Sequence, residues 1–171
     1  METGKRNFKD KKLILTLDLG LKTGYAIGTQ GKLLEHGMLK LPNKQKGDRY
    51  FFFGQWLAEK HKTYNFQKIV FELVNFIGDR TSPCSAHAYG GYKAILESFA
   101  YANQISIETL TVREIKQAFA EKSNCGKEKI IQKVNEHGFN VTDDNEADAL
   151  AIFLITTKDK HHDYTTGNRL N

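Results

Sequence analysis

A stretch near the N-terminus, residues 13–28, decides the fold, and it reads LILTLDLGLKTGYAIG. Its first half is an apolar run that ends in the carboxylate of Asp18, and glycine-containing turn signals separate it from the second half. This pattern predicts a strand, a tight turn and a second strand, which together form a hairpin. A charge beside so apolar a run is costly unless it is hydrogen-bonded, paired or bound to a metal. Asp18 is therefore either a turn aspartate that bonds to its own backbone or a residue that serves a partner.

The composition indicates one globular domain. The chain has 171 residues, of which 40% are hydrophobic, and this is enough for one core but too little for two separate domains. A formal net charge of +5 points mildly to a polyanionic partner. Cys84 and Cys125 form no CxxC pair, so we expect neither a disulfide framework nor a structural zinc site, and a cytoplasmic location. No apolar segment is long enough to span a bilayer, so no membrane partner is expected.

The pattern beyond the hairpin predicts a mixed α/β sheet flanked by helices. A third strand over residues 32–41 completes an antiparallel three-strand meander. Asp48 is placed to cap a helix that runs to residue 64, and a short apolar strand over residues 68–73 follows it. A strand that follows a crossover helix should join the sheet parallel to the first strand. Apolar periodicity further predicts a strand over residues 105–110 and helices over residues 85–103, 111–119, 127–137 and 144–155.

Polar segments flank the predicted domain. Residues 1–12 are basic, and we expect a flexible arm that is either a solvated tail or a DNA contact. The domain is predicted to cover residues 13–158, and residues 159–171 are predicted to form a flexible tail.

Three carboxylates lie on three separate elements. Asp18 and Glu72 each lie near the carboxyl end of an apolar strand, and parallel pairing brings such ends together. Asp148 lies a full turn inside the last predicted helix, between two alanines that allow the helix to approach the sheet closely. Ordinary compensation of the helix dipole is the alternative explanation for the acids at the start of this helix.

Carboxylates brought together repel one another, so a divalent cation is the natural neutraliser. Oxygen ligands without Cys or His favour Mg²⁺ or Mn²⁺ over zinc. Two such ions about 4 Å apart activate a water and stabilise the leaving oxygen of a phosphodiester. The constellation therefore predicts hydrolysis of a nucleic-acid backbone.

The motifs LDLG with TGYA around Asp18, IVFE ending in Glu72, and ADALAI around Asp148 resemble those of the RuvC-type Holliday junction resolvases of the ribonuclease H-like superfamily. The similarity runs from about residue 13 to residue 155. The resemblance implies a ribonuclease H-like fold and a metal-dependent endonuclease that nicks two opposed strands of a four-way DNA junction as a homodimer. It also implies that Asp18 touches both metals, that Glu72 and Asp148 flank them, and that the source is a bacterium or a phage-infected host.

The chain departs from the resemblance at one position. The family's last motif usually has a second acid three residues before the terminal aspartate, and here that position is Asn145. An amide oxygen can ligate a metal but adds no charge. Asp144 lies on the same helical face as Asp148 and is able to replace the missing acid, whereas Glu146 should point elsewhere.

Residues that contact nucleic acid are expected in two places. By the resemblance, Phe76 and Arg80 lie in the loop that carries a stacking aromatic, so Phe76 would wedge against unstacked bases, or else pack within its own loop. Lys122, Lys127 and Lys129 would meet backbone phosphates, or else form an ordinary solvated helix start.

Three other functions compete with a junction resolvase. A ribonuclease H-like nuclease of the rRNA maturation type would use the same acids on RNA, because the acids meet a phosphodiester and not the sugar. A non-catalytic junction-binding protein is suggested by Asn145. An actin-like ATPase is suggested by the opening hairpin, but that fold needs a second domain for which this chain is too short.

Overall fold

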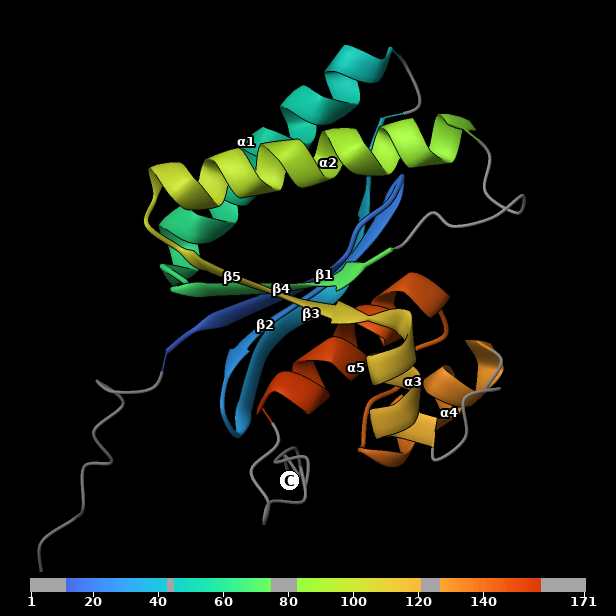
Figure 1. The fold of residues 1–171 in the computed structure, drawn as a ribbon. Coiled ribbons are helices and arrows are strands. Elements are labelled where there is room, and N and C mark those ends of the chain that lie inside the picture. The colour runs from blue at the N-terminus through green and yellow to red at the C-terminus, as the bar shows by residue number, and fades with distance from the viewer. Residues whose placement is uncertain (1–11, 43–44, 75–82, 121–126, 158–171) are drawn as a thin grey trace, which may run out of the picture.

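A five-stranded mixed sheet with the order β3-β2-β1-β4-β5 forms the centre of the molecule (Figure 1). The computed structural model describes residues 12–42, 45–74, 83–120 and 127–157. The predicted antiparallel meander is confirmed and consists of β1 (Ile14–Asp18), β2 (Lys22–Thr29) and β3 (Lys32–Lys40). Two further strands then extend the sheet in parallel. β4 (Lys68–Leu73) pairs with β1, and β5 (Ser106–Thr111) pairs with β4.

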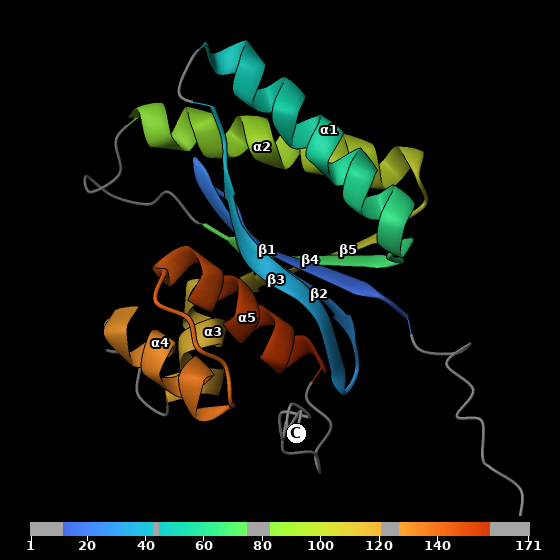
Figure 2. The same ribbon diagram turned by 180° about the vertical axis from the view of Figure 1, so that it is seen from behind.

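Helices cover both faces of the sheet, which confirms the predicted fold class. One face carries α1 (Lys46–Tyr64) and α2 (Pro83–Ala102). The opposite face carries α3 (Val112–Ala120), α4 (Lys127–Glu136) and α5 (Asp144–Thr157), as the two opposed views show (Figures 1 and 2). The chain therefore folds as three layers with the sheet in the middle.

Side-chain alternation along the central strands divides the interior into two cores. Leu15 and Leu17 of β1 pack toward α1 and α2 in one core, together with Ile69 and Phe71 of β4. The other core contains Val70 of β4 and the apolar side chains of α5. The helix α5 lies at the centre of this second core, because its side chains from Ala149 to Leu154 are all buried.

The starts of two helices show how each is capped. Thr111 caps α3, because its Oγ1 accepts from the amide of Glu114 at 3.2 Å while the Glu114 carboxylate accepts from the amide of Thr111 at 2.7 Å. The prediction that Asp48 caps α1 is wrong. The helix begins at Lys46 with Gln45 as the N-cap residue, so Asp48 lies inside the first turn, where a negative charge still complements the helix dipole.

The structure bears on two expectations from composition, one about the cysteines and one about membrane-spanning segments. Cys84 is exposed and forms no disulfide within the described ranges, whereas Cys125 lies outside them. No helix among the described residues has the length and apolar character that crossing a bilayer requires.

A polar cluster attaches the β3 edge of the sheet to α1. The Glu35 carboxylate accepts hydrogen bonds from the hydroxyls of Tyr25 at 2.7 Å and Tyr64 at 2.6 Å, and also from the ammonium of Lys60. Burial by itself would raise the pKa of Glu35, but the hydrogen bonds from Lys60, Tyr64 and Tyr25 outweigh it and hold this pKa below its usual value. The ionised form of Glu35 therefore stabilises the fold.

We predict that Glu35→Gln lowers the free energy of unfolding at pH 7 by about 1–2 kcal/mol, because the charge-assisted bonds are lost. The pKa of Glu35 is depressed in the folded state, so its contribution is fully present above about pH 4.3 and is lost as the pH falls through the folded-state pKa. Urea denaturation from pH 7 to pH 3 should show the difference from wild type shrink. Glu97→Gln, which breaks only an exposed pair with Lys93, is the control. A difference that stays constant over this pH range would contradict the prediction.

Candidate active site

Asp18 and Glu72 occupy equivalent positions on neighbouring parallel strands. Leu17 of β1 is paired with Phe71 of β4, so the two acids follow at the next position on each strand, and both are partly buried. Alternation places Asp18 on the same face of β1 as Thr16, whose hydroxyl donates to the carbonyl of Ala149 on α5 at 2.8 Å. The same reasoning places Glu72 with Val70, which packs in the α5 core. Both strand acids therefore lie on the face of the sheet that α5 covers.

The first turn of α5 lies directly against the hairpin that carries Asp18. Gly24 is the cross-strand partner of Asp18, and a Cβ atom at Gly24 would lie 1.8 Å from the carbonyl oxygen of Asn145. Only a residue without a side chain permits this approach. The structure thus brings the Asp144 and Asn145 end of α5 to the strand end that carries Asp18.

The register between α5 and the hairpin continues beyond this contact. Ala149 lies at Thr16, and Phe153 lies so close to Gly28 that a Cβ there would be 2.7 Å from its ring. Four helical residues rise about 6 Å and two strand residues about 6.8 Å, so each helical turn advances with one pair of strand positions. Asp148 is one helical turn beyond Asp144 on the same face, and it is partly buried.

The start of α5 is capped by Asp143, a residue that the sequence reasoning did not single out. Its Oδ1 accepts from the amides of Asn145 at 3.0 Å and Glu146 at 3.2 Å. The side-chain amide of Asn145 donates to Asp143 at 3.2 Å and to Asp144 at 3.1 Å. The missed signal was an aspartate directly before the first residue of an apolar helix.

Glu146 points away from the strand acids, as predicted. Its carboxylate lies 2.6 Å from Nδ1 of His36 on β3, and the His36 ring packs edge-on against Phe139. This pair connects α5 to the β3 edge of the sheet.

Tyr89 of α2 holds the backbone that carries Glu72, and no sequence pattern pointed to this role. The Tyr89 hydroxyl donates to the carbonyl of Glu72 at 2.9 Å and accepts from the amide of Val74 at 3.2 Å. Burial raises the pKa of Tyr89 above its ordinary value, so the hydroxyl keeps its proton at neutral pH. This contact fixes the point where the chain leaves β4.

The donor chemistry of these residues fits Mg²⁺ or Mn²⁺, because Asp18, Glu72, Asp144, Asn145 and Asp148 offer only carboxylate and amide oxygens. Within the described ranges, no group of three or more His, Cys, Asp or Glu side chains is arranged as a metal cluster. The metal ligand set therefore stays a prediction.

The predicted nucleic-acid contacts fall mostly beyond the described parts of the chain. Phe76, Arg80 and Lys122 lie outside them, and Lys127 begins α4 without a described side chain. Lys129 is exposed on α4, whose Ile130 and Val134 face the α5 core. These five contacts stay predictions.

Solved structures identify the fold. The structure of T. thermophilus RuvC in complex with a Holliday junction substrate matches with a TM-score of 0.68 and 18% identity, covering 82% of this chain and 89% of that chain. The chain has the RuvC-type resolvase fold. The yeast mitochondrial Holliday junction resolvase Ydc2 matches with a TM-score of 0.60 and 14% identity, covering 81% of this chain and 75% of that chain.

A further match is the Fowlpox virus resolvase in complex with substrate Holliday junction DNA. Its TM-score is 0.50 and its identity 15%, with 84% of this chain and 97% of that chain covered. No protein-family model and no curated protein matches the sequence. The expected RuvC-type fold is thus confirmed.

We predict that Gly24→Ala destabilises the protein by about 1–3 kcal/mol, because the new Cβ displaces the first turn of α5. Chemical denaturation measures this change. Gly90→Ala is the matched control, since a Cβ at this exposed position on α2 meets no atom within 4 Å among the described residues. That control should be neutral or stabilising by up to about 1 kcal/mol. A Gly24→Ala protein as stable as wild type would show that α5 is not held at the hairpin.

Proposed function

We propose that this protein is a divalent-metal-dependent endonuclease that resolves four-way or other branched DNA junctions. The observation that carries the proposal is the placement of Asp18 and Glu72 at matched positions on β1 and β4, with the first turn of α5 packed against Gly24 opposite Asp18. Known resolvases of the same fold supply the substrate class.

In this proposal Asp18, Glu72 and Asp148 hold the metal, with Asp144 or Asn145 as a further oxygen donor. Bound Mg²⁺ or Mn²⁺, one ion or two, would supply activation of water and stabilisation of the leaving oxygen of a phosphodiester. Thr16 and Asp143 orient α5 relative to the strand acids, and Tyr89 fixes the backbone at Glu72. The positive end of the α5 dipole favours the negative charge of the acids and of a nearby phosphate.

The proposed partner is branched DNA, bound by a homodimer. T. thermophilus RuvC and the Fowlpox virus resolvase were each solved with junction DNA. A net charge of +5 favours a polyanion. A dimer would bring two sites to a junction, and this would allow paired nicks on opposed strands.

A non-catalytic junction-binding protein is the second candidate, because Asn145 offers no negative charge at the helix start. Its side-chain amide is neutral and donates hydrogen bonds to the carboxylates of Asp143 and Asp144, so position 145 adds no negative charge to attract a metal ion.

We predict that Asp18→Asn lowers the nicking of a synthetic four-way DNA junction by at least about a hundredfold, since loss even of a group that supports a metal ligand costs 10–100-fold. Gel assays with Mg²⁺ or Mn²⁺ should compare the junction with a linear duplex and an RNA–DNA hybrid. Asp48→Asn, an equivalent change on the opposite face of the sheet, is the control and should nick as wild type does. Preference for the hybrid would indicate an RNA-processing nuclease instead, and equal nicking by Asp18→Asn would refute the proposed site.

We predict that Asn145→Asp lowers the Mg²⁺ concentration needed for half-maximal nicking by about tenfold, because it adds a charged oxygen ligand. Asn103→Asp introduces the same charge after the end of α2 and serves as the control. If wild type binds junctions without nicking them and Asn145→Asp nicks, the second candidate describes the natural protein. If the substitution leaves the metal dependence unchanged, position 145 is not a ligand.

A further inference from the structure

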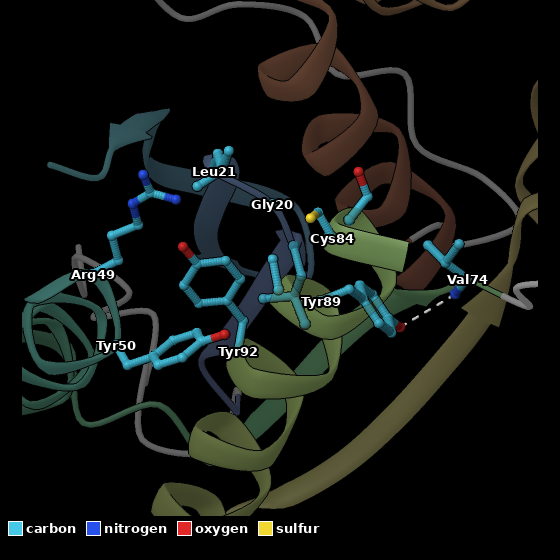
Figure 3. A pocket seen from close by; sticks show the side chains of 11 residues that line it. Gly20, Leu21, Arg49, Tyr50, Val74, Cys84, Tyr89 and Tyr92 are labelled. Atoms are coloured by element: carbon cyan, nitrogen blue, oxygen red, sulfur yellow. Dashed lines mark hydrogen bonds between the residues drawn. The ribbon is translucent and has the colours of Figure 1, made fainter. Parts of the chain in front are cut away.

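A cavity of about 380 Å³ lies at the same end of the sheet as the strand acids but on the α1 and α2 side (Figure 3). Leu19 lines it and directly follows Asp18, while Val74 lines it two residues after Glu72. Leu19 packs in the core beneath α1 and α2, so the chain crosses from the acid face to the cavity face within one residue. A ligand in this cavity would be a near neighbour of the proposed active site.

The Tyr92 hydroxyl is a buried polar group among the residues that line this cavity. The Tyr92 side chain is 0% exposed, and its hydroxyl has no hydrogen-bond partner within the part of the chain that the structure describes. An unsatisfied buried hydroxyl is destabilising, so such a group is uncommon without a purpose. In Figure 3 the hydroxyl points toward the Arg49 side chain that lines the same cavity.

The hydroxyl of Tyr92 is suited to both donate and accept. Burial raises the pKa of Tyr92 above its ordinary value, and this effect outweighs the opposing charge of Arg49. The proton therefore stays on the hydroxyl at neutral pH, and the group is able to bond to either kind of atom on a ligand.

The lining of the cavity combines aromatic rings with one cationic side chain. Tyr50 and Tyr92 meet edge-on with their ring centroids 5.2 Å apart, and the ring of Tyr89 forms a further part of the lining. Arg49 lies at the start of α1, where its Nε donates to the carbonyl of Pro42 at 3.1 Å. Ser85, in the first turn of the 20-residue helix α2, also lines the cavity, and the amino end of such a helix favours anions.

We propose that this cavity binds a nucleotide, with its base against the tyrosine rings and bonded to the Tyr92 hydroxyl, and its phosphate toward Arg49 and the start of α2. A planar base with polar edges matches an aromatic lining with one buried hydroxyl, and the volume lies within the range of small-molecule sites. The nucleotide comes either from solution or from the branched DNA, in which case it is an unstacked residue of the junction. Only that second source rests on the proposed function.

The first test uses a free nucleotide and needs no nuclease activity. We would titrate the fluorescent 5′-monophosphate of 2-aminopurine deoxyribonucleoside with wild-type protein, Tyr92→Phe and Ala88→Leu in the presence of EDTA. Tyr92→Phe removes only the hydroxyl and should weaken binding about three- to tenfold, the value of one hydrogen bond. Ala88→Leu fills the cavity from α2 and should abolish binding.

Tyr101→Phe is the matched control for this titration, because Tyr101 lies on the same helix but is 89% exposed. It should bind the nucleotide as wild type does. Thermal unfolding separates binding from folding, since Tyr92→Phe removes an unsatisfied group and should be at least as stable as wild type.

The second test identifies the source of the nucleotide. We would measure the binding of the same four proteins, in EDTA, to a series of four-way junctions that each carry one abasic site. From one junction to the next, the abasic site moves by one nucleotide through the exchange point. If the base comes from DNA, one abasic position weakens binding to wild type and Tyr101→Phe but not to Ala88→Leu. If only the free nucleotide binds in a Tyr92-dependent manner, the cavity takes its ligand from solution.

The proposal is overturned if wild type neither binds the free nucleotide nor distinguishes any abasic position. It is also overturned if all four proteins bind the nucleotide and every junction equally. Either result leaves the nicking assays with Asp18→Asn unaffected. Conversely, a protein that nicks nothing but binds the nucleotide through Tyr92 would refute the proposed function and support the cavity.

Discussion

The contact between α5 and the opening hairpin is the constraint on which the rest of the structure depends. Thr16 bonds to the backbone of α5, while Gly24 and Gly28 leave space for it at either end. Four helix residues and two strand residues advance by similar distances, about 6 Å and 6.8 Å, so successive turns of α5 meet alternate positions of β2. The residues at these positions, Gly24, Ala26 and Gly28, are all small and allow the close approach. This register determines which turn of α5 arrives at Asp18, and thereby which side chains are available to the site.

Local patterns were sufficient to predict the strand acids. Asp18 and Glu72 each follow a short, nearly continuous apolar run, and parallel pairing then brings their strand ends together. The inward faces of α2, α4 and α5 were equally predictable from apolar spacing. Caps were less predictable. The N-cap residue of α1 is Gln45 and not Asp48. Several polar residues lie near the start of this helix, and the sequence alone does not show which of them is the cap.

The features of the site that local sequence patterns did not predict arise from contacts between residues far apart in the chain. The bond from Tyr89 to the Glu72 carbonyl and the pair of His36 with Glu146 depend on how a helix crosses a strand end, which no local pattern encodes. The same holds for the cavity beneath Tyr92, since the residues that form it come from two helices and two strand ends. The rings of Tyr89 and Tyr92 also pack in the core beneath α1 and α2.

The order of the strands determines which strand pairs persist when the sheet begins to open. β1 and β4, which carry Asp18 and Glu72, each have a neighbour on both sides, whereas β3 and β5 form the edges. Fraying of an edge strand leaves the two central strands paired, because opening begins where backbone groups are least enclosed. The spacing of the two acids is therefore lost only when β1 and β4 separate from each other.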